Sequence, residues 1–296
     1  MPNPTTTYRS LDGIECGKAL RARIAEETQK VLKSRGHVPH LAAVLVGEDA
    51  ASQTYVASKV KSCEEVGFRS TLLKRSAEIT EAELMEMVAQ LNEDPEVDGF
   101  IVQLPLPKHI DEERVTLAID PAKDVDGFHP QNLGRMMLGL PGYLPATPNG
   151  IVELLKFYEI PTEGKHCVVV GRSNIVGTPM SILMSRNTYP GNCTVTITHS
   201  RTKDLPAITR QADILIVAIG KAGFITADMV KEGAVVVDVG IHRVEDASRK
   251  RGYRLSGDVD FDGVAPKCSW ITPVPGGVGP MTVTSLLLNT LKAAKS

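Results

Sequence analysis

The sequence predicts an α/β protein built from two doubly wound domains, the second of which binds a dinucleotide. Short apolar runs, such as Leu41–Val46 and Gly99–Leu104, alternate with segments of helical character, as in parallel sheets flanked by helices. A strand, a glycine turn and a helix follow one another at His166–Pro179. Around that turn, forty residues from Gly164 to Lys203 contain no aspartate or glutamate. Together these observations favour a Rossmann-type second domain.

The bulk composition excludes several classes of protein. The chain has 296 residues, enough for two domains, with a formal net charge of −2 and 4% aromatic residues, so we expect no nucleic-acid partner. Its five cysteines are single and lack a C-x-x-C pair, which favours a reducing compartment and argues against a zinc site. No apolar run approaches the roughly 18–20 residues of a membrane helix, and the first residues do not resemble a signal peptide. We therefore expect a cytoplasmic protein that binds no membrane and no metal.

In the first domain, apolar runs predict strands and capping signals predict helices. The expected strands are 41–46, 70–73 and 99–104. The expected helices are 50–66, closed by Gly67, and 80–91, opened by the capping-box sequence Thr80-Glu-Ala-Glu83. The stretch 123–149 is rich in glycine and proline, and it is expected to be loop and crossover.

The second domain repeats the alternation. A helix at 150–158 is expected to lead into strands at 166–171, 193–198, 213–219 and 234–239. The last helix, 281–294, has no strand of its own and is expected to pack back onto the first domain. We therefore predict a catalytic domain of residues 1–149 plus 275–296 and a dinucleotide-binding domain of residues 150–274.

The glycine turn indicates which dinucleotide binds. It reads Gly171-Arg-Ser-Asn-Ile-Val-Gly177, so Ser173 replaces the middle glycine of G-x-G-x-x-G and the last glycine comes one residue late. Proteins that bind NAD usually carry an acid after the second strand, whereas this chain has His199-Ser200-Arg201-Thr202. Arg172 and Ser173, with Ser200 and Arg201, are suited to a 2′-phosphate, which predicts NADP. The alternative is a structural turn with surface arginines.

Tyr55 and Lys59 are the first candidate catalytic pair. Their i, i+4 spacing places a phenol and an ammonium on one face of a helix. A lysine desolvated in a cleft has its pKa lowered toward roughly 7–8, where it serves as acid or base. The alternative is a solvated lysine beside a packed tyrosine. The pair also occurs in short-chain dehydrogenases, but there it follows the glycine turn within one domain.

Three other polar or glycine-rich sites follow the predicted strands. Gln103 lies at the carboxyl end of the third strand, where α/β sheets bind ligands, although it is equally suited to bonding the next loop. In Asp124-Val-Asp-Gly127, a buried carboxylate that bonds a heterocycle is the functional interpretation, and an Asx-type turn is the alternative. The loop 273–281 contains three glycines and three prolines and is suited to a flat ligand close to the backbone.

The order of these motifs resembles one family. Tyr55-x-x-x-Lys59, Gln103-Leu-Pro-Leu-Pro, the Asp124 motif, Thr147-Pro-x-Gly150, the turn motif ending at Pro179 and Pro273-Val-Pro-Gly-Gly-Val-Gly-Pro-Met-Thr282 occur together in methylenetetrahydrofolate dehydrogenase/cyclohydrolases. The resemblance spans about residues 11–291. One position departs from it, because Ala146 stands where the family usually has cysteine.

The resemblance implies oxidation of 5,10-methylenetetrahydrofolate by NADP⁺ and hydrolysis of the methenyl product to 10-formyltetrahydrofolate, in a cleft between the domains. These steps belong to one-carbon metabolism and supply purine biosynthesis. By similarity, Lys59 is the central catalytic residue, held and tuned by Gln103. Tyr55 stacks on or orients the folate, and Asp126 bonds the pterin.

The remaining implied site residues line the two ligands. The folate site includes Pro275, Gly276, Gly277, Val278 and Gly279. The cofactor site includes Thr147, Pro148, Gly171, Arg172, Ser173, Ile175, Val176, Gly177, Ser200, Arg201, Gly240 and Ile241. The resemblance further implies tetrahydrofolate substrates, including polyglutamylated forms, and a homodimer formed through the second domain.

Two alternatives stay open at this point. One is another two-domain NADP oxidoreductase similar to shikimate dehydrogenase, which also has a catalytic lysine and aspartate but does not account for the Pro-Gly-Gly-Val-Gly-Pro loop. The other is a catalytically silent NADP-binding protein on the same fold. Against the silent protein, Tyr55, Lys59, Gln103 and Asp126 are all present.

Overall fold

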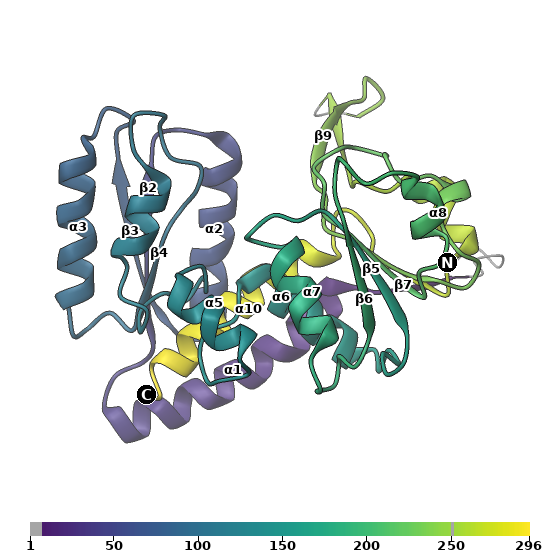
Figure 1. Cartoon of the computed structure of the whole chain (residues 1–296). Helices are drawn as coiled ribbons and strands as arrows, with labels where there is room; N and C mark the ends of the chain where they lie inside the picture. Colours follow the sequence, from purple (N-terminus) through teal and green to yellow (C-terminus); the bar gives the residue numbers. More distant parts are fainter. Residues whose placement is uncertain (1–7, 250–251) are drawn as a thin grey trace. The chain divides into compact units, whose positions relative to one another are not determined.

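The computed structural model in Figure 1 describes residues 8–249 and 252–296. The chain divides into two compact units. One, termed here the dinucleotide unit, comprises Met1–Gly17 and Thr147–Thr282; the other, the lysine unit, comprises Lys18–Ala146 and Val283–Ser296. Among the helices of the described ranges, none combines the length and apolar character that a membrane crossing requires.

The lysine unit contains a three-stranded parallel sheet. Its strands, in the order β3-β2-β4, are β2 (His40–Val46), β3 (Arg69–Arg75) and β4 (Gly99–Val102). The helices that supply its residues are α1 (Gly13–Arg35), α2 (Ala50–Glu65), α3 (Glu81–Glu93), α4 (Glu112–Ala118), α5 (Pro130–Met137) and α10 (Val278–Ala293), of which α1 and α10 begin in the dinucleotide unit.

The central strand β2 is buried along its whole length because both faces of the sheet are covered. Ala43 and Leu45 belong to a core cluster with residues of α1, α2 and α10. Ala42 and Val44 point the other way, into a cluster with residues of α3. Figure 1 shows α2 and α3 on opposite sides of this sheet. The unbroken apolar run of β2 therefore reflects a parallel strand covered on both faces.

The local signals of this unit act as the sequence predicts, with one exception. Thr80 Oγ1 accepts a hydrogen bond from the Glu83 amide at 3.2 Å, and the Glu83 carboxylate accepts one from the Thr80 amide at 2.8 Å, so the capping box forms.

The prediction of loop across 123–149 was wrong, because α5 lies within it. His129 caps that helix through Nδ1, which accepts from the Gln131 amide, and Pro130 occupies the first turn, where proline is favourable.

The dinucleotide unit contains a six-stranded, all-parallel sheet. Its order is β1-β11-β8-β7-β5-β6, with β1 (Arg9–Ser10), β5 (His166–Val170), β6 (Thr194–Thr198), β7 (Ile214–Val217), β8 (Val235–Asp238) and β11 (Trp270–Ile271). The remaining elements are α6 (Ala146–Phe157), α7 (Gly177–Ser185), α8 (Leu205–Thr209), α9 (Phe261–Val264), the short helices η1 (Ala227–Met229) and η2 (Ala265–Lys267), and the hairpin β9 (His242–Glu245) and β10 (Tyr253–Ser256). Val168, Leu215 and Val236, from three neighbouring strands, are buried in one core cluster.

The compact units differ from the predicted domain division at both ends of the chain. Strand β1 pairs with β11, which groups the amino-terminal segment with the dinucleotide unit. The Gly13 amide donates to the Gly276 carbonyl at 2.9 Å, so the glycine-rich loop groups with the dinucleotide unit as well. Further along α10, Leu286 and Leu287 are buried in the core of the lysine unit, so the last helix packs where the sequence predicts.

Candidate active site and family

Lys59 is a buried amine in the lysine unit. It lies in α2, its residue is 8% exposed, and its ammonium donates to Gln103 Oε1 at 3.0 Å. Burial lowers the pKa of Lys59, and the nearby carboxylate of Asp126 opposes that shift. A lysine with these surroundings is suited to take up and release a proton, which a solvated lysine at its usual pKa does less readily near neutral pH.

Gln103 is fixed by three hydrogen bonds immediately after β4. Its amide donates to the Val44 carbonyl at 2.9 Å, which continues the ladder to β2. Its side-chain Nε2 donates to the Leu104 carbonyl at 2.8 Å, so Oε1 is the atom turned to Lys59. Both interpretations of Gln103 therefore hold at once: one end bonds the following loop, and the other end holds the candidate catalytic lysine.

The two carboxylates of the Asp124 motif have different environments. Asp124 is 2% exposed and accepts from the amides of Gly127 and His129 and from Asn132 Nδ2. It is the turn-forming residue that the sequence left as an alternative. Asp126 is half-buried; burial raises its pKa, and Lys59 opposes the shift. The carboxylate available to a ligand is therefore Asp126.

Tyr55 lies one turn before Lys59 on α2 and is half-buried. Burial raises the pKa of its phenol, so the hydroxyl stays protonated at neutral pH. The lysine unit thus brings together Lys59, Gln103 and Asp126, with Tyr55 on the same helix as the lysine. The predicted folate-binding residues 275–279 belong to the dinucleotide unit.

The nucleotide turn of the dinucleotide unit depends on its two glycines. Gly171 follows β5 with φ of 121°, and a Cβ there would lie 2.2 Å from the Ala218 carbonyl oxygen. A Cβ on Gly177 would lie 2.1 Å from the Gly171 carbonyl oxygen. No side chain fits at either position, so the chain can fold back closely from β5 into α7.

Ser173 has a role in this turn that sequence reasoning did not find. Its Oγ accepts hydrogen bonds from the amides of Val176 at 3.2 Å and Gly177 at 3.3 Å. The Gly177 amide is the first of α7 and the Val176 amide belongs to the residue before it; both would otherwise face solvent or a ligand. The serine in place of the middle glycine therefore satisfies the two amides at the entry to α7. The sequence signal for this role was the spacing: a serine hydroxyl commonly accepts from an amide three residues later, and Val176 is three residues after Ser173.

The residues predicted to bind the 2′-phosphate of NADP lie just after two adjacent strands. The Gly171 amide donates to the Thr198 carbonyl at 3.0 Å, which joins the turn after β5 to the end of β6. Arg172, Ser200 and Arg201 are exposed on the two segments that start there. His199 Nδ1 accepts from the Arg201 amide at 3.2 Å, which fixes the backbone of the second segment. The site presents arginines and no acidic side chain.

The remaining predicted residues of this unit lie in two further places. Thr147, in the first turn of α6, has its Oγ1 3.0 Å from Thr282 Oγ1, and Pro148 follows it. In the glycine-rich segment, Gly276 has φ of 111°, and a Cβ on Gly279, in the first turn of α10, would meet nothing within 4 Å.

Gly240 and Ile241 follow β8 at the same sheet edge as Gly171, and Ile241 is 47% exposed. Ile175 is exposed in the nucleotide turn, whereas Val176 is buried.

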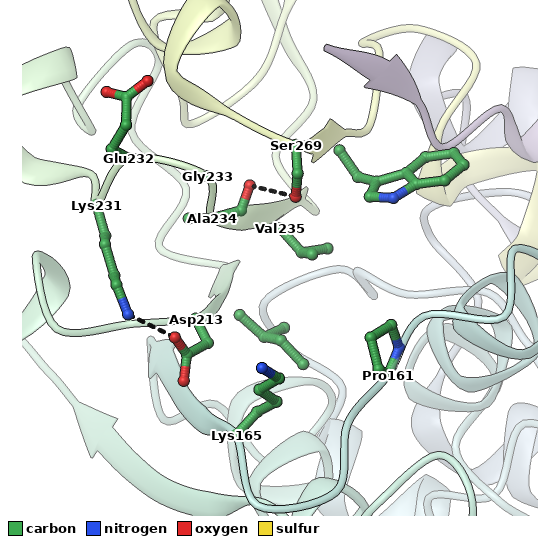
Figure 2. Close-up of a pocket in the computed structure, with 11 residues that line it drawn as sticks. Pro161, Lys165, Asp213, Lys231, Glu232, Gly233, Ala234, Val235 and Ser269 are labelled. Carbon is green, nitrogen blue, oxygen red and sulfur yellow. Dashed lines mark hydrogen bonds and ion pairs between the residues drawn. The ribbon is translucent and has the colours of Figure 1, made fainter.

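A separate pocket opens at the opposite, amino-terminal edge of the sheet. Figure 2 shows it lined by Lys165, Asp213 and Lys231, with Lys231 Nζ 2.6 Å from Asp213 Oδ1. Ligands of doubly wound sheets bind at the carboxyl ends of strands, so this pocket is not the cofactor site. Within residues 8–249 and 252–296, no cluster of three or more histidine, cysteine or acidic side chains is arranged to hold a metal ion.

Comparison with known proteins identifies the family. The model of the tetrahydrofolate dehydrogenase/cyclohydrolase catalytic domain matches residues 11–126, and that of the family's NAD(P)-binding domain matches residues 145–296. Proteins named bifunctional protein FolD from Cytophaga hutchinsonii and Porphyromonas gingivalis are 64% and 60% identical, over 96% and 98% of this chain and 98% of each relative.

Solved structures agree in fold. The bifunctional FolD enzyme of Campylobacter jejuni is 48% identical with a TM-score of 0.91, covering 97% of this chain and 99% of that one. The methylenetetrahydrofolate dehydrogenase-cyclohydrolase of Trypanosoma brucei, solved with NADP cofactor and an inhibitor, is 38% identical with a TM-score of 0.91 over 97% of each chain. The predicted fold class and family are confirmed, and this chain belongs to the tetrahydrofolate dehydrogenase/cyclohydrolase family.

Proposed function

We propose that this chain oxidises 5,10-methylenetetrahydrofolate to the methenyl compound with NADP⁺ and then hydrolyses that compound to 10-formyltetrahydrofolate. The observation that carries this proposal is the buried Lys59 held by Gln103 beside Asp126. Family membership confirms the predicted bifunctional activity and sets aside both alternatives, the shikimate-dehydrogenase-like oxidoreductase and the silent NADP-binding protein.

The dinucleotide unit fits NADP. Its turn lets a nucleotide approach the backbone at Gly171, and Arg172 and Arg201 are exposed beside Ser200 at adjoining strand ends. Guanidinium groups bind a phosphate through charge-assisted hydrogen bonds, and no acid in the stretch 164–203 repels it. Bound NADP⁺ supplies the hydride acceptor.

The oxidation requires positioning more than acid–base catalysis. Loss of hydride from the methylene carbon leaves a cation delocalised over two nitrogens, so no group of the protein has to remove a proton. We assign the orientation of the folate to Tyr55 and Asp126. A carboxylate at Asp126 matches the donors of the pterin amino group and ring N–H, and Tyr55 offers a flat, half-buried ring.

The hydrolysis requires a group that accepts a proton and returns it. Neutral Lys59 takes a proton from water as the water oxygen bonds to the methenyl carbon. The resulting ammonium gives that proton to the ring nitrogen as the carbon–nitrogen bond breaks. The proton that remains on the added oxygen passes to solvent, which leaves a neutral formyl group on the other nitrogen. Burial lowers the pKa of Lys59 and makes its neutral form accessible, and Gln103 Oε1 accepts from the ammonium.

Absorbance at the methenyl-folate band tests the function directly. Methylenetetrahydrofolate is offered with NADP⁺ or with NAD⁺ in separate cuvettes. NADP⁺-dependent appearance of the band, followed by decay faster than the spontaneous rate, is the expected result. No change with either cofactor would overturn the proposal, and a band that decays at the spontaneous rate would leave only the dehydrogenase.

The partners follow from the same proposal: tetrahydrofolate substrates, including polyglutamylated forms, and a second copy of this chain. Strand β6 ends the sheet of the dinucleotide unit as described, and its Ile197 is 39% exposed. An edge strand with exposed apolar side chains is suited to pair with its own copy. Light scattering after size-exclusion chromatography should give the dimer mass; a monomer at micromolar concentration would contradict this.

We also assign the protein to the cytoplasm, because Cys16, Cys63, Cys167, Cys193 and Cys268 are all free and buried.

A further inference from the structure

The carboxyl ends of β7 and β8 lie at the same edge of the sheet as the nucleotide turn, on the side of β5 opposite to β6 and Arg201. In the sheet, β7 and β8 lie on one side of β5 and β6 lies on the other. A dinucleotide whose 2′-phosphate is held after β6, and whose diphosphate crosses the turn after β5, extends its nicotinamide half toward the ends of β7 and β8. The segments after those strands are Ile219–Lys221 and Gly240–His242.

One buried carboxylate organises both segments. Asp258 is 0% exposed and accepts from three successive amides: those of Ile219 at 2.7 Å, Gly220 at 3.1 Å and Lys221 at 2.8 Å. His242 Nε2 lies 2.7 Å from Asp258 Oδ1, so the imidazole donates a fourth hydrogen bond from the other segment. Four donors match the roughly four acceptor sites of an ionised carboxylate.

A second carboxylate joins Asp258 to the end of β8. Asp238 accepts from the amides of Gly240 at 2.9 Å, Asp258 at 2.9 Å and Val259 at 3.0 Å. A Cβ on Gly240 would lie 2.5 Å from Asp258 Oδ1, so the backbone after β8 is held directly against this carboxylate. The two segments are therefore fixed to each other through Asp258.

The same network reaches the nucleotide turn. Ala218 precedes the segment that Asp258 holds, and its carbonyl oxygen would lie 2.2 Å from a Cβ on Gly171. A shift of Ile219–Lys221 would therefore displace the carbonyl against which the turn packs. Because the three amides bond Asp258, they are not available to a cofactor phosphate. Asp258 therefore shapes this edge of the sheet and does not itself contact the cofactor.

We propose that Asp258 is a positioning residue for the nicotinamide half of NADP: it holds Ile219–Lys221 and Gly240–His242 in the arrangement that receives the cofactor. This inference rests on the proposed NADP site. In Asp258→Asn a single carboxamide oxygen replaces two carboxylate oxygens, and its NH₂ group faces N–H donors. Loss of charge-assisted hydrogen bonds of this kind corresponds to about tenfold or more in affinity.

The experiment measures NADP⁺ binding by calorimetry together with the two activities. For Asp258→Asn we expect the Kd and KM for NADP⁺ to rise about tenfold or more. Hydrolysis of supplied methenyltetrahydrofolate, assayed without NADP⁺, should keep the wild-type rate, since that step uses Lys59 in the lysine unit. The matched control is Asp260→Asn, which removes the same charge from an exposed residue two positions away.

A second pair of variants covers the case in which Asp258→Asn does not fold. His242→Leu removes one donor to Asp258, whereas His242→Gln keeps an N–H donor at the end of the side chain. We expect weaker NADP⁺ binding in the leucine variant and near-normal binding in the glutamine variant. Unchanged NADP⁺ affinity in a folded Asp258→Asn or in His242→Leu would overturn the proposal, and so would an equal loss of both activities.

Failure of the proposed function has a different signature. A wild-type protein that binds NADP⁺ but does not oxidise methylenetetrahydrofolate would refute the function, while the binding constants of the variants would still decide the role of Asp258.

Discussion

In the proposed mechanism Lys59 transfers the proton, because the protein keeps its amine out of water and so lowers its pKa. The side chain donates to Gln103, and the carboxylate of Asp126 is the charge that opposes its desolvation. We predict that Lys59→Met folds, binds NADP⁺ with unchanged affinity and loses cyclohydrolase activity, because no other group replaces its proton transfer. Decay of the methenyl band measures the loss.

The control for that variant is Lys61→Met, since Lys61 is an exposed lysine on the same helix. It should hydrolyse at the wild-type rate. Wild-type hydrolysis by a folded Lys59→Met protein would remove Lys59 from the mechanism.

Asp238 gives a prediction about stability and pH. Burial raises the pKa of Asp238 from 3.8 to about 6, although three backbone amides oppose the shift. Between these values the native state holds more protons than the unfolded state, so the contribution of this group to stability falls as pH rises from 3.8 through about 6 and is constant above. The free energy of unfolding of the wild type, relative to Asp238→Asn, should drop by up to about 3 kcal/mol from pH 4 to pH 7.

Denaturant unfolding at several pH values provides that measurement. Asp260→Asn, at an exposed aspartate, is the comparison variant. A difference between wild type and Asp238→Asn that does not vary with pH would mean that Asp238 titrates normally.

At the scale of elements, we propose that the segment after β6 determines the choice between NADP and NAD. Arg201 is exposed there, on a backbone held by His199. We predict that Arg201→Ala raises the KM for NADP⁺ about tenfold or more and leaves the KM for NAD⁺ unchanged, because only NADP⁺ has the 2′-phosphate. Initial rates with each cofactor test this.

Arg210→Ala is the matched control, because Arg210 is an exposed arginine at the end of α8 that bonds the Asp228 carbonyl. If Arg201→Ala raised the KM for NADP⁺ and the KM for NAD⁺ equally, Arg201 would not be a ligand of the 2′-phosphate.

Helix α7 offers a second prediction at this scale. Ser173→Ala removes the acceptor of two amides at the start of the helix, and loss of a cap costs about 1 kcal/mol. Thermal unfolding should detect that loss. Ser181→Ala, which removes a hydroxyl that donates to the Thr178 carbonyl within the same helix, should have a smaller effect. Equal stability of Ser173→Ala and the wild type would mean that water caps α7 equally well.

At the scale of the molecule, the sequence predicts what local patterns encode. The apolar strand Leu41–Val46 and the capping box at Thr80 are formed as expected, because each depends on residues close together in the chain. The division into units was less predictable, since it depends on pairing of β1 with β11, about 260 residues away. Such pairing leaves no local signal.

The candidate site likewise contains residues that a local pattern predicts and residues whose role depends on the folded chain. Lys59 was predicted from its i, i+4 spacing to Tyr55, and Gln103 because it is a polar residue within an apolar run. The turn-forming role of Asp124 was given only as an alternative, and the role of the Ser173 hydroxyl was not predicted, because each depends on amides that become neighbours only after the turn has formed. The Asp238 and Asp258 network was missed for the same reason, since its partners come from three separate segments.

The cap that Ser173 provides has a consequence for how the cofactor can be exchanged over evolution. In a G-x-G-x-x-G protein, the helix amides hold the diphosphate that NAD and NADP share, so changing the ribose pocket alone converts one preference into the other. Here two of those amides are already bonded within the protein. A larger part of the affinity then depends on the phosphate that NADP alone carries. A lineage that lost its arginines would therefore weaken its binding of NADP without strengthening its binding of NAD, unless Ser173 changed as well.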